Sequence, residues 1–271
     1  MENIKGLDVS MWQKTINWSK IDTDEYKFVF VRARNSNRVQ DPTFEYNFVR
    51  AKEIGMMVGA YQYFIPDKDP EKQAELFLQS LDKVGGLGSD DMPPVMDIES
   101  NGVHDRDVLI KNMNTWIRII KKETKKTPII YTYPSFWNTL RVYDFKEYPL
   151  WIAHYTKKGS PLVPKPWENW TFWQYTGSGD VEGIKTPVDK SVFNGGVDDL
   201  KKFIEESNIV GTIPPPKPID SKTISYINLL SDIIRDSETE RDDVSIIMLS
   251  PWQRFVLFIY RIIDAILSKI R

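Results

Sequence analysis

The sequence contains no cysteine and only two histidines among its 271 residues. Disulfides and thiolate metal sites are therefore excluded, and two histidines are too few for a histidine-rich metal site. No apolar run approaches the roughly eighteen uncharged residues that a membrane-spanning helix needs. The first residues, Met1–Gly6, show no basic segment followed by an apolar one, so we expect no secretory signal peptide.

The chain also lacks an excess of charge of either sign. Its 36 basic and 38 acidic residues leave a net charge of −2, which gives no reason to expect a nucleic-acid partner. Hydrophobic residues make up 41% and charged residues 27%, which is ordinary for a globular protein of this length. The length allows one barrel-sized domain plus an appendage. The 9 Trp and 12 Tyr are a large number, and they serve either as core residues or as platforms for sugar rings.

The most informative motif is Met96-Asp97-Ile98-Glu99-Ser100, which directly follows the apolar run Pro93-Pro94-Val95. Residues two apart on a strand point to one face, so Asp97 and Glu99 are expected to project together with Cα atoms roughly 6.6–7 Å apart. A pair of carboxylates at about this separation is what glycoside hydrolysis uses. On these residues alone, a strand end that enters a solvated loop explains the motif equally well.

The first two hundred residues alternate short apolar segments with amphipathic ones. Predicted strands, rich in Val, Ile and aromatic residues, are Ile4–Val9, Lys27–Ala33, Met57–Phe64, Pro94–Ile98, Thr127–Tyr133, Leu150–Tyr155, Trp170–Gln174 and Val188–Phe193. Asp41-Pro42 and Asp69-Pro70 each predict a helix start, with Asp as N-cap and Pro at the first helical position. Gly85-Gly86 is expected to end the second of these helices, and further helices are predicted over Val108–Lys122 and Val197–Glu206.

This succession predicts an α/β fold, an irregular TIM-like β/α barrel with few helices, whose later strands are joined by loops or hairpins. Functional groups of such barrels gather at the carboxyl ends of the strands. The polar and aromatic residues near predicted strand ends are Asp8, Tyr61, Asp97, Glu99, Tyr131, Trp151 and Gln174.

The chain changes character after residue 207. Residues 208–222 hold Gly211, Pro214-Pro215-Pro216 and Pro218, which predicts a stiff proline-rich linker. Residues 223–271 are predicted to form a small helical module, whose last segment, Pro251–Arg271, has a broad apolar face and four basic groups against one acid. Three roles remain open for this module: docking on the barrel or a second copy, wall binding, or binding a membrane surface.

Seven motifs in order resemble the muramidases of glycoside hydrolase family 25, over residues 4 to 206. They are Gly6-Leu7-Asp8-Val9-Ser10-Met11-Trp12-Gln13, Phe28-Val29-Phe30-Val31-Arg32-Ala33, Gly59-Ala60-Tyr61-Gln62-Tyr63-Phe64, Met96-Asp97-Ile98-Glu99, Leu150-Trp151-Ile152-Ala153-His154-Tyr155, Trp173-Gln174-Tyr175, and the run from Val188 to Gly195. Two segments depart from the family pattern. Lys190-Ser191 replaces an apolar-Asn pair, and Arg34-Asn35-Ser36 replaces a small turn that contains glycine.

The resemblance implies cleavage of the β-1,4 bond between N-acetylmuramic acid and N-acetylglucosamine in peptidoglycan, without metal or cofactor. It implies that Glu99 is the proton donor and that Asp97 acts on the substrate's N-acetyl group or an intermediate. Asp8 and Asp189 match the family's other two acids. The residues expected to line the substrate groove are Tyr61, Tyr131, Trp151, Gln174 and Tyr175. From the residues, we expect the negative charge of Asp97 to help keep Glu99 protonated.

Two other functions remain in view. A chitinase-like hydrolase also uses an acidic strand end, and a non-catalytic carbohydrate-binding or virion protein can retain the fold. The N-terminal motif argues against the first, and the retention of all four acids argues against the second. We expect a phage endolysin, made in the host bacterial cytoplasm and linked only indirectly to a holin. A bacterial autolysin and a phage tail lysin are the alternatives.

Overall fold

The computed structural model describes residues 3–36, 39–100, 102 and 105–209. The predicted module 223–271, and all of the predicted linker beyond Ile209, lie outside the described residues. No helix in the described part is both long and apolar enough to cross a membrane.

Eight strands close into a barrel, which confirms the predicted fold class. They are β1 (Lys5–Val9), β2 (Tyr26–Asn35), β4 (Met57–Tyr63), β5 (Val95–Asp97), β6 (Ile129–Thr132), β7 (Leu150–Ala153), β8 (Phe172–Val181) and β9 (Ile184–Phe193). The order β1-β9-β8-β7-β6-β5-β4-β2 is closed by pairing of β1 with β2, and the short β3 (Val39–Gln40) extends only the edge of β2.

The barrel is parallel except at one strand. Neighbours from β1 through β2 and on to β8 run parallel, whereas β9 is antiparallel to both β8 and β1. The β8–β9 hairpin, in which Val181 pairs with Ile184, is the predicted irregularity among the later strands. A hairpin reverses the chain without a helix, which explains why the barrel has fewer helices than strands.

Five helices flank the barrel: α1 (Phe44–Glu53), α2 (Pro70–Asp82), α3 (Arg106–Thr124), α4 (Pro134–Leu140) and α5 (Val197–Ser207). The first four connect successive parallel strands. Helix α4 was not predicted, because seven residues make only two turns and show little periodicity. The Asp69 side chain caps α2 by accepting from the amides of Glu71 and Lys72, as predicted.

The predicted helix start at Asp41-Pro42 is wrong by two residues, although Oδ1 of Asp41 accepts from the amide and the hydroxyl of Thr43, at 2.9 and 2.7 Å. Helix α1 begins at Phe44, after Thr43, and the Asp41 carboxylate lies just outside the helix. Its Oδ2 accepts hydrogen bonds from the amide of Met11 and from Nε of Arg32, both at 2.9 Å. Asp41 therefore combines a local contact with Thr43 and a tertiary ion pair with Arg32, and a local pattern cannot show the second.

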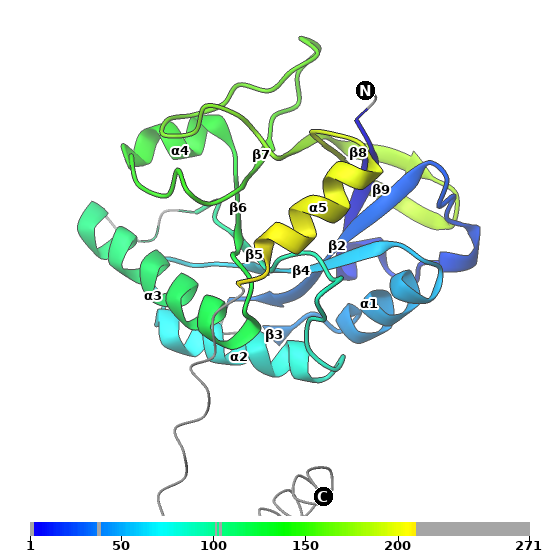
Figure 1. Cartoon of the computed structure of the whole chain (residues 1–271), viewed down its shortest axis with the longest axis horizontal. Coiled ribbons are helices and arrows are strands. Elements are labelled where there is room, and N and C mark those ends of the chain that lie inside the picture. Colours follow the sequence, from blue (N-terminus) through cyan, green and yellow to red (C-terminus); the bar gives the residue numbers. More distant parts are fainter. Residues whose placement is uncertain (1–2, 37–38, 101, 103–104, 210–271) are drawn as a thin grey trace, which may run out of the picture. The chain divides into compact units, whose positions relative to one another are not determined.

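Aromatic side chains fill the barrel interior because glycines lie opposite them. A Cβ atom on Gly6 would lie 2.3 Å from the ring of Phe28, and one on Gly59 would lie 2.7 Å from the ring of Phe30. Helix α5 adds Leu200 to this interior cluster, and Figure 1 shows it in yellow across the barrel strands. The interior below the site is thus a packed core and not a channel.

Candidate active site

Four carboxyl groups meet at one cavity of about 320 Å³. Asp8 lies on β1 and pairs in register with Asp189 of β9, while Asp97 ends β5 and Glu99 follows it. The cavity is lined by Asp8, Arg32, Asn35, Tyr61, Tyr63, Asp97, Glu99, Tyr131, Trp151, Tyr155, Gln174 and Asp189. All the predicted site residues are therefore brought together here except Tyr175. Side chains alternate along a strand, so the inward direction of Gln174 turns Tyr175 to the outer face, where it packs against Trp173.

Asp97 and Glu99 form a hydrogen-bonded pair of carboxyl groups, in which Asp97 is buried and Glu99 is partly buried. Burial raises the pKa of Asp97 well above its ordinary value, and the charge of Glu99 and a hydrogen bond between the two carboxyls raise it further. The pKa of Glu99 is also raised, by burial first and by the charge of Asp189. The hydrogen bond with Asp97 acts in the opposite direction on Glu99. Burial is the largest cause of the raised pKa of both carboxyls in this coupled pair, and the expectation that the charge of Asp97 helps keep Glu99 protonated stays a prediction.

One atom of this pair has no protein partner. Asp97 is 5% exposed, and its Oδ1 accepts no hydrogen bond from any of the described residues. An unsatisfied buried carboxylate oxygen is costly, typically about 1–3 kcal/mol or more. It is therefore an available acceptor for a donor that a bound substrate would bring.

Gln174 is occupied by protein partners on both sides of its amide. Its Nε2 donates to both carboxylate oxygens of Asp8, at 3.1 and 3.0 Å. The hydroxyl groups of Tyr131 and Tyr155 both donate to its Oε1, at 3.0 and 2.9 Å. Two donors on the oxygen fix the direction of the amide, so the geometry gives Gln174 a role in positioning Asp8.

Tyr155 is a site residue that the sequence reasoning missed. Besides Gln174, its hydroxyl reaches Asp189, where the hydrogen bond lowers the carboxyl pKa while burial, the larger effect, raises it. The signal was available, because Tyr155 ends the predicted strand Leu150–Tyr155, at the edge where functional groups gather.

Arg32 was missed as well. It is the only cation among the described residues that line the cavity, and its Nε bonds to Asp41 at 2.9 Å. Its charge lowers the pKa of Asp97, against the larger effect of burial. The alternation of β2 places Arg32 on the same inward face as Phe30, and this periodicity could have identified it.

Trp151 forms part of the cavity floor and explains one departure from the family pattern. Its ring stacks on Phe30 with centroids 4.5 Å apart, and its Nε1 donates to Oγ of Ser191 at 3.1 Å. The Nζ of Lys190 donates to the carbonyl of Asp180 instead, away from the cavity. Ser191 therefore supports the site from below, and Lys190 does not reach the substrate position.

The other departure lies at the end of β2. Ser36 has a φ of 55°, in the left-handed region that favours glycine, which accounts for a glycine-containing turn in the family pattern. Here the Ser36 hydroxyl donates to Oε1 of Gln73 at 3.0 Å, and Nε2 of Gln62 donates to the Ser36 carbonyl at 3.1 Å. These buried hydrogen bonds hold the turn beside Asn35 in place without glycine.

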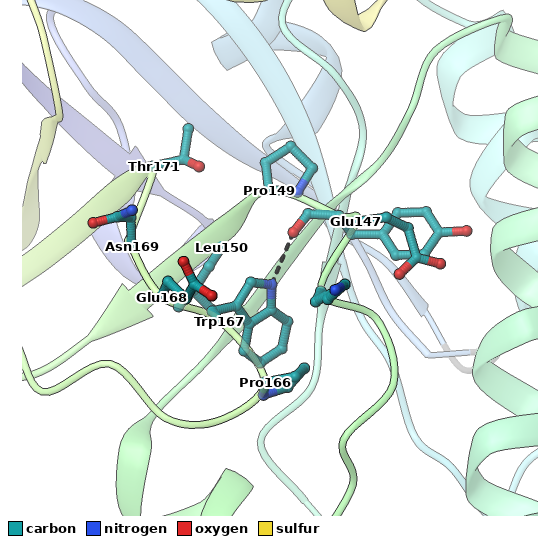
Figure 2. A pocket seen from close by; sticks show the side chains of 10 residues that line it. Glu147, Pro149, Leu150, Pro166, Trp167, Glu168, Asn169 and Thr171 are labelled. Atoms are coloured by element: carbon teal, nitrogen blue, oxygen red, sulfur yellow. Dashed lines mark hydrogen bonds between the residues drawn. The ribbon is translucent and has the colours of Figure 1, made fainter.

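A second hollow is also lined by acidic residues, but these residues are exposed. This hollow of about 490 Å³ lies at the beginning of β7 and β8, and Glu147 and Glu168 in its lining are exposed; Figure 2 shows the side chains that line it. Trp167 forms one wall and donates from Nε1 to the carbonyl of Tyr148 at 2.9 Å. It lies at the amino ends of the strands, away from the cavity that holds Asp8, Asp97, Glu99 and Asp189.

The cavity at the carboxyl ends has the chemistry of a glycoside hydrolase. Such enzymes need one carboxyl group that stays protonated near neutral pH and a second that stabilises or attacks the sugar. The raised pKa values of Asp97 and Glu99 provide a carboxyl group that stays protonated. With Asp8 and Asp189 in the same cavity, other acids remain to stabilise or attack the sugar.

Comparison with known proteins identifies the family. Residues 7–184 match the model of the glycosyl hydrolases family 25. The chain is 37% identical over 207 residues to the uncharacterized protein YegX of Escherichia coli K12, which covers 74% of each chain. It is 33% identical over 204 residues to lysozyme M1 of Streptomyces globisporus, covering 71% of this chain and 68% of that one.

Solved structures agree. The crystal structure of the bacterial lysozyme from Streptomyces coelicolor superposes with a TM-score of 0.69 at 29% identity, covering 76% of this chain and 99% of that one. The chain therefore belongs to glycosyl hydrolase family 25 and is a glycoside hydrolase of the lysozyme, or muramidase, type.

Proposed function

We propose that this protein hydrolyses the β-1,4 bond between N-acetylmuramic acid and N-acetylglucosamine in peptidoglycan. The observation that carries the proposal is the pair of buried Asp97 and partly buried Glu99, both with raised pKa values, in a cavity shared with Asp8 and Asp189. Family membership supports the same substrate class, because lysozyme M1 of Streptomyces globisporus and the solved structure from Streptomyces coelicolor are lysozymes.

In the proposed reaction Glu99 donates its proton to the glycosidic oxygen, so that the leaving sugar departs as an alcohol. The free Oδ1 of Asp97 accepts the N–H of the substrate's N-acetyl group and orients that group. The acetamido oxygen then attacks the anomeric carbon, or Asp97 itself does, and Glu99 removes a proton from the water that completes hydrolysis. Asp8 and Asp189 hold the substrate and water in place.

The test is Glu99→Gln, measured by release of muropeptides from purified sacculi with mass spectrometry of the products. Loss of a general acid costs about 10²–10⁴-fold in turnover, and circular dichroism should show an unchanged fold. Glu168→Gln, in the hollow of Figure 2, is the matched control and should retain full activity. Retention of a tenth of wild-type turnover by Glu99→Gln, or new reducing ends that are not muramic acid, would refute the proposal.

The two routes through Asp97 differ in what they require of the substrate. If the acetamido oxygen attacks, sacculi whose muramic acid has been chemically de-N-acetylated become poor substrates for the wild-type protein. If Asp97 attacks directly, a covalent glycosyl-protein adduct is expected on Asp97 when a slow fluorinated substrate is used. Intact mass spectrometry distinguishes the two.

The biological setting we propose is host lysis by a phage endolysin, which is produced in the host cytoplasm and reaches the wall through a holin. Support comes from the sequence of residues 251–271, where four basic groups and an apolar face with Trp252 suit the anionic inner membrane face. Expression in a bacterium with and without a holin tests this setting. Lysis that begins only when the holin is triggered supports it, and lysis at the same rate without holin contradicts it.

A further inference from the structure

The hydroxyl group of Tyr155 meets two acceptors but carries one proton. Its Oη lies 2.9 Å from Oε1 of Gln174, and it also forms a hydrogen bond with the carboxyl group of Asp189. A phenol hydroxyl has a single hydrogen to donate. The proton of Tyr155 therefore points either to Gln174 or to Asp189.

Gln174 does not depend on that proton. Its Oε1 also accepts from the hydroxyl group of Tyr131 at 3.0 Å, and its Nε2 donates to both carboxyl oxygens of Asp8. The amide thus stays hydrogen-bonded at both ends when Tyr155 turns away from it. Hydrogen bonds to a carboxylate are stronger than those to a neutral amide oxygen, so an ionised Asp189 takes the proton of Tyr155.

Gly177 on β8 allows the hydroxyl and carboxyl groups to meet. A Cβ atom at this position would lie 2.9 Å from Oη of Tyr155 and 3.0 Å from Oδ1 of Asp189. Both atoms therefore lie next to the space that a side chain would fill. A residue larger than glycine would have to move one of them, and the contact would be lost.

Asp189 is an acid whose charge acts on Glu99. The negative charge of Asp189 adds to burial in raising the pKa of Glu99. The hydrogen bond from Tyr155 lowers the pKa of Asp189, against the larger effect of burial, and it is the only side-chain hydrogen bond acting on Asp189 among the described residues. The hydroxyl group thus favours the charged form of Asp189, and that charge favours the protonated form of Glu99.

Other titratable and charged groups face the same cavity from the neighbouring strands. They are Asp8 on β1, Arg32 on β2, Tyr61 and Tyr63 on β4, Asp97 at the end of β5, and Tyr131 on β6. His154 precedes Tyr155 in the chain, and its Nδ1 is occupied by the amide of Leu162. Burial raises the pKa of Tyr155 above its ordinary value, so its hydroxyl group remains a donor over the range in which the acids titrate.

We infer that Tyr155 is a positioning residue of the reaction: its hydroxyl proton holds Asp189 as a carboxylate, and the charge of Asp189 keeps the catalytic proton on Glu99. Gly177 makes the contact possible. This inference rests on the proposed function, in which Glu99 is the proton donor.

The test follows the carboxyl groups directly, by NMR of the full-length protein with isotope-labelled aspartate. The resonance of Asp189 is identified by its loss in Asp189→Asn. In Tyr155→Phe, Asp189 should titrate at least about 0.5 pH unit higher than in wild type, because its hydrogen-bond donor is gone. Gly177→Ala should move the titration in the same direction although the hydroxyl group is retained.

Tyr175→Phe is the matched control. It removes a hydroxyl group from the outer face of β8, where Tyr175 packs against Trp173, and should leave the titration of Asp189 unchanged. Tyr155→3-fluorotyrosine gives a stronger donor at the same place, so Asp189 should then titrate at lower pH than in wild type. A packing defect would not reverse the direction of the shift.

The pH–rate profile reports the consequence for Glu99. With the tetrasaccharide GlcNAc–MurNAc–GlcNAc–MurNAc as substrate, the alkaline limb marks the loss of the proton from Glu99. This limb should lie at lower pH in Tyr155→Phe and Gly177→Ala than in wild type, because protonated Asp189 no longer raises the pKa of Glu99. It should not move in Tyr175→Phe.

The same Asp189 titration in Tyr155→Phe and wild type, or shifts of one sign with Phe and 3-fluorotyrosine, would overturn the inference and leave the proposed function intact. A shifted titration with an unchanged alkaline limb would also overturn it, because Asp189 would then not act on Glu99. Full activity of Glu99→Gln would instead overturn the proposed function.

Discussion

At the scale of single residues, the site depends on the burial of its carboxyl groups. Asp8, Asp97, Glu99 and Asp189 all have raised pKa values, and burial is the largest cause for each. Keeping several acids in so small a cavity favours their neutral forms, since ionisation without water is unfavourable. A supply of protons near neutral pH follows from this, and so does a loss of stability when the acids ionise.

Asp97→Asn should therefore have opposite effects on activity and stability. Turnover on sacculi should fall strongly, and a limb of the pH–rate profile should shift, because one partner of the hydrogen-bonded pair is lost. For stability the sign follows from proton uptake: the folded protein keeps the Asp97 proton above its ordinary pKa of 3.8, where the unfolded chain has lost it. Asp97 therefore does not reduce the stability of the fold below pH 3.8. The stability falls as the pH rises through the pKa that Asp97 has in the folded protein.

The measurement is the melting temperature of wild type and Asp97→Asn from pH 3 to pH 8. The variant should melt higher than wild type at the alkaline end, and the difference should vanish below about pH 4, near the unfolded pKa of a carboxyl group. Asp144→Asn, at an exposed position, is the control and should give no such pH-dependent gain. Equal melting curves for wild type and Asp97→Asn at every pH, or normal turnover with an unchanged profile, would contradict this account.

At the scale of helices and strands, strand pairing and interior packing set the geometry of the site. Phe28 and Phe30 on β2 enter the interior because Gly6 on β1 and Gly59 on β4 leave room for their rings. The same strands then carry Asp8 and Arg32 to the rim, two positions further along on the same faces. The packed lower part of the barrel thus supports the site above it.

Gly6→Ala tests this dependence. Its Cβ would overlap the Phe28 ring, and an overpacked core costs about 1–3 kcal/mol. Chemical denaturation should show that loss, and Phe28→Leu in the same chain should restore part of it by making space. Gly196→Ala is the control, because the nearest atom to its added Cβ is 3.5 Å away. If Gly6→Ala is as stable as Gly196→Ala, the close packing of Phe28 against β1 is refuted.

At the scale of the whole molecule, a buried lysine binds the end of the described part of the chain. Lys126 is 1% exposed, and its Nζ donates to the carbonyls of Ser89 and Asp91 and to Oδ1 of Asn208, at 3.2, 2.8 and 2.7 Å. The amide of Ile209 donates to the carbonyl of Lys125 at 2.7 Å. The pairing thus extends two residues past the predicted domain end at 207.

Truncation should consequently be made after Gly211, where the first compact unit ends. We expect residues 1–211 to fold, by circular dichroism, and to cleave purified sacculi at a rate close to that of the full chain. The full chain should bind anionic liposomes or self-associate through residues 223–271, and the truncated protein should do neither. A truncated protein that is unfolded or inactive would contradict an independent catalytic unit, and a monomeric full chain that ignores liposomes would leave docking on the barrel as the role of the tail.

Local patterns in the sequence determined much of the barrel and most of the site. Each of the eight barrel strands overlaps a predicted one, because apolar alternation and the flanking turns are properties of short segments. Asp8, Asp97, Glu99 and Asp189 could be found because the four lie in motifs that resemble one family. Because functional groups gather at the carboxyl ends of barrel strands, the predicted strand ends also indicated that these side chains lie together.

Only the tertiary structure decided how the polar groups pair. Asp41 forms an ion pair with Arg32, Gln174 is held between Asp8 and two tyrosine hydroxyls, and the charge of Asp189 adds to burial in raising the pKa of Glu99. Each pairing joins groups from different parts of the chain, and its strength depends on distance and burial, which no local pattern contains. The meeting of Tyr155 and Asp189 beside Gly177 has the same origin, since it exists only between elements that have already packed.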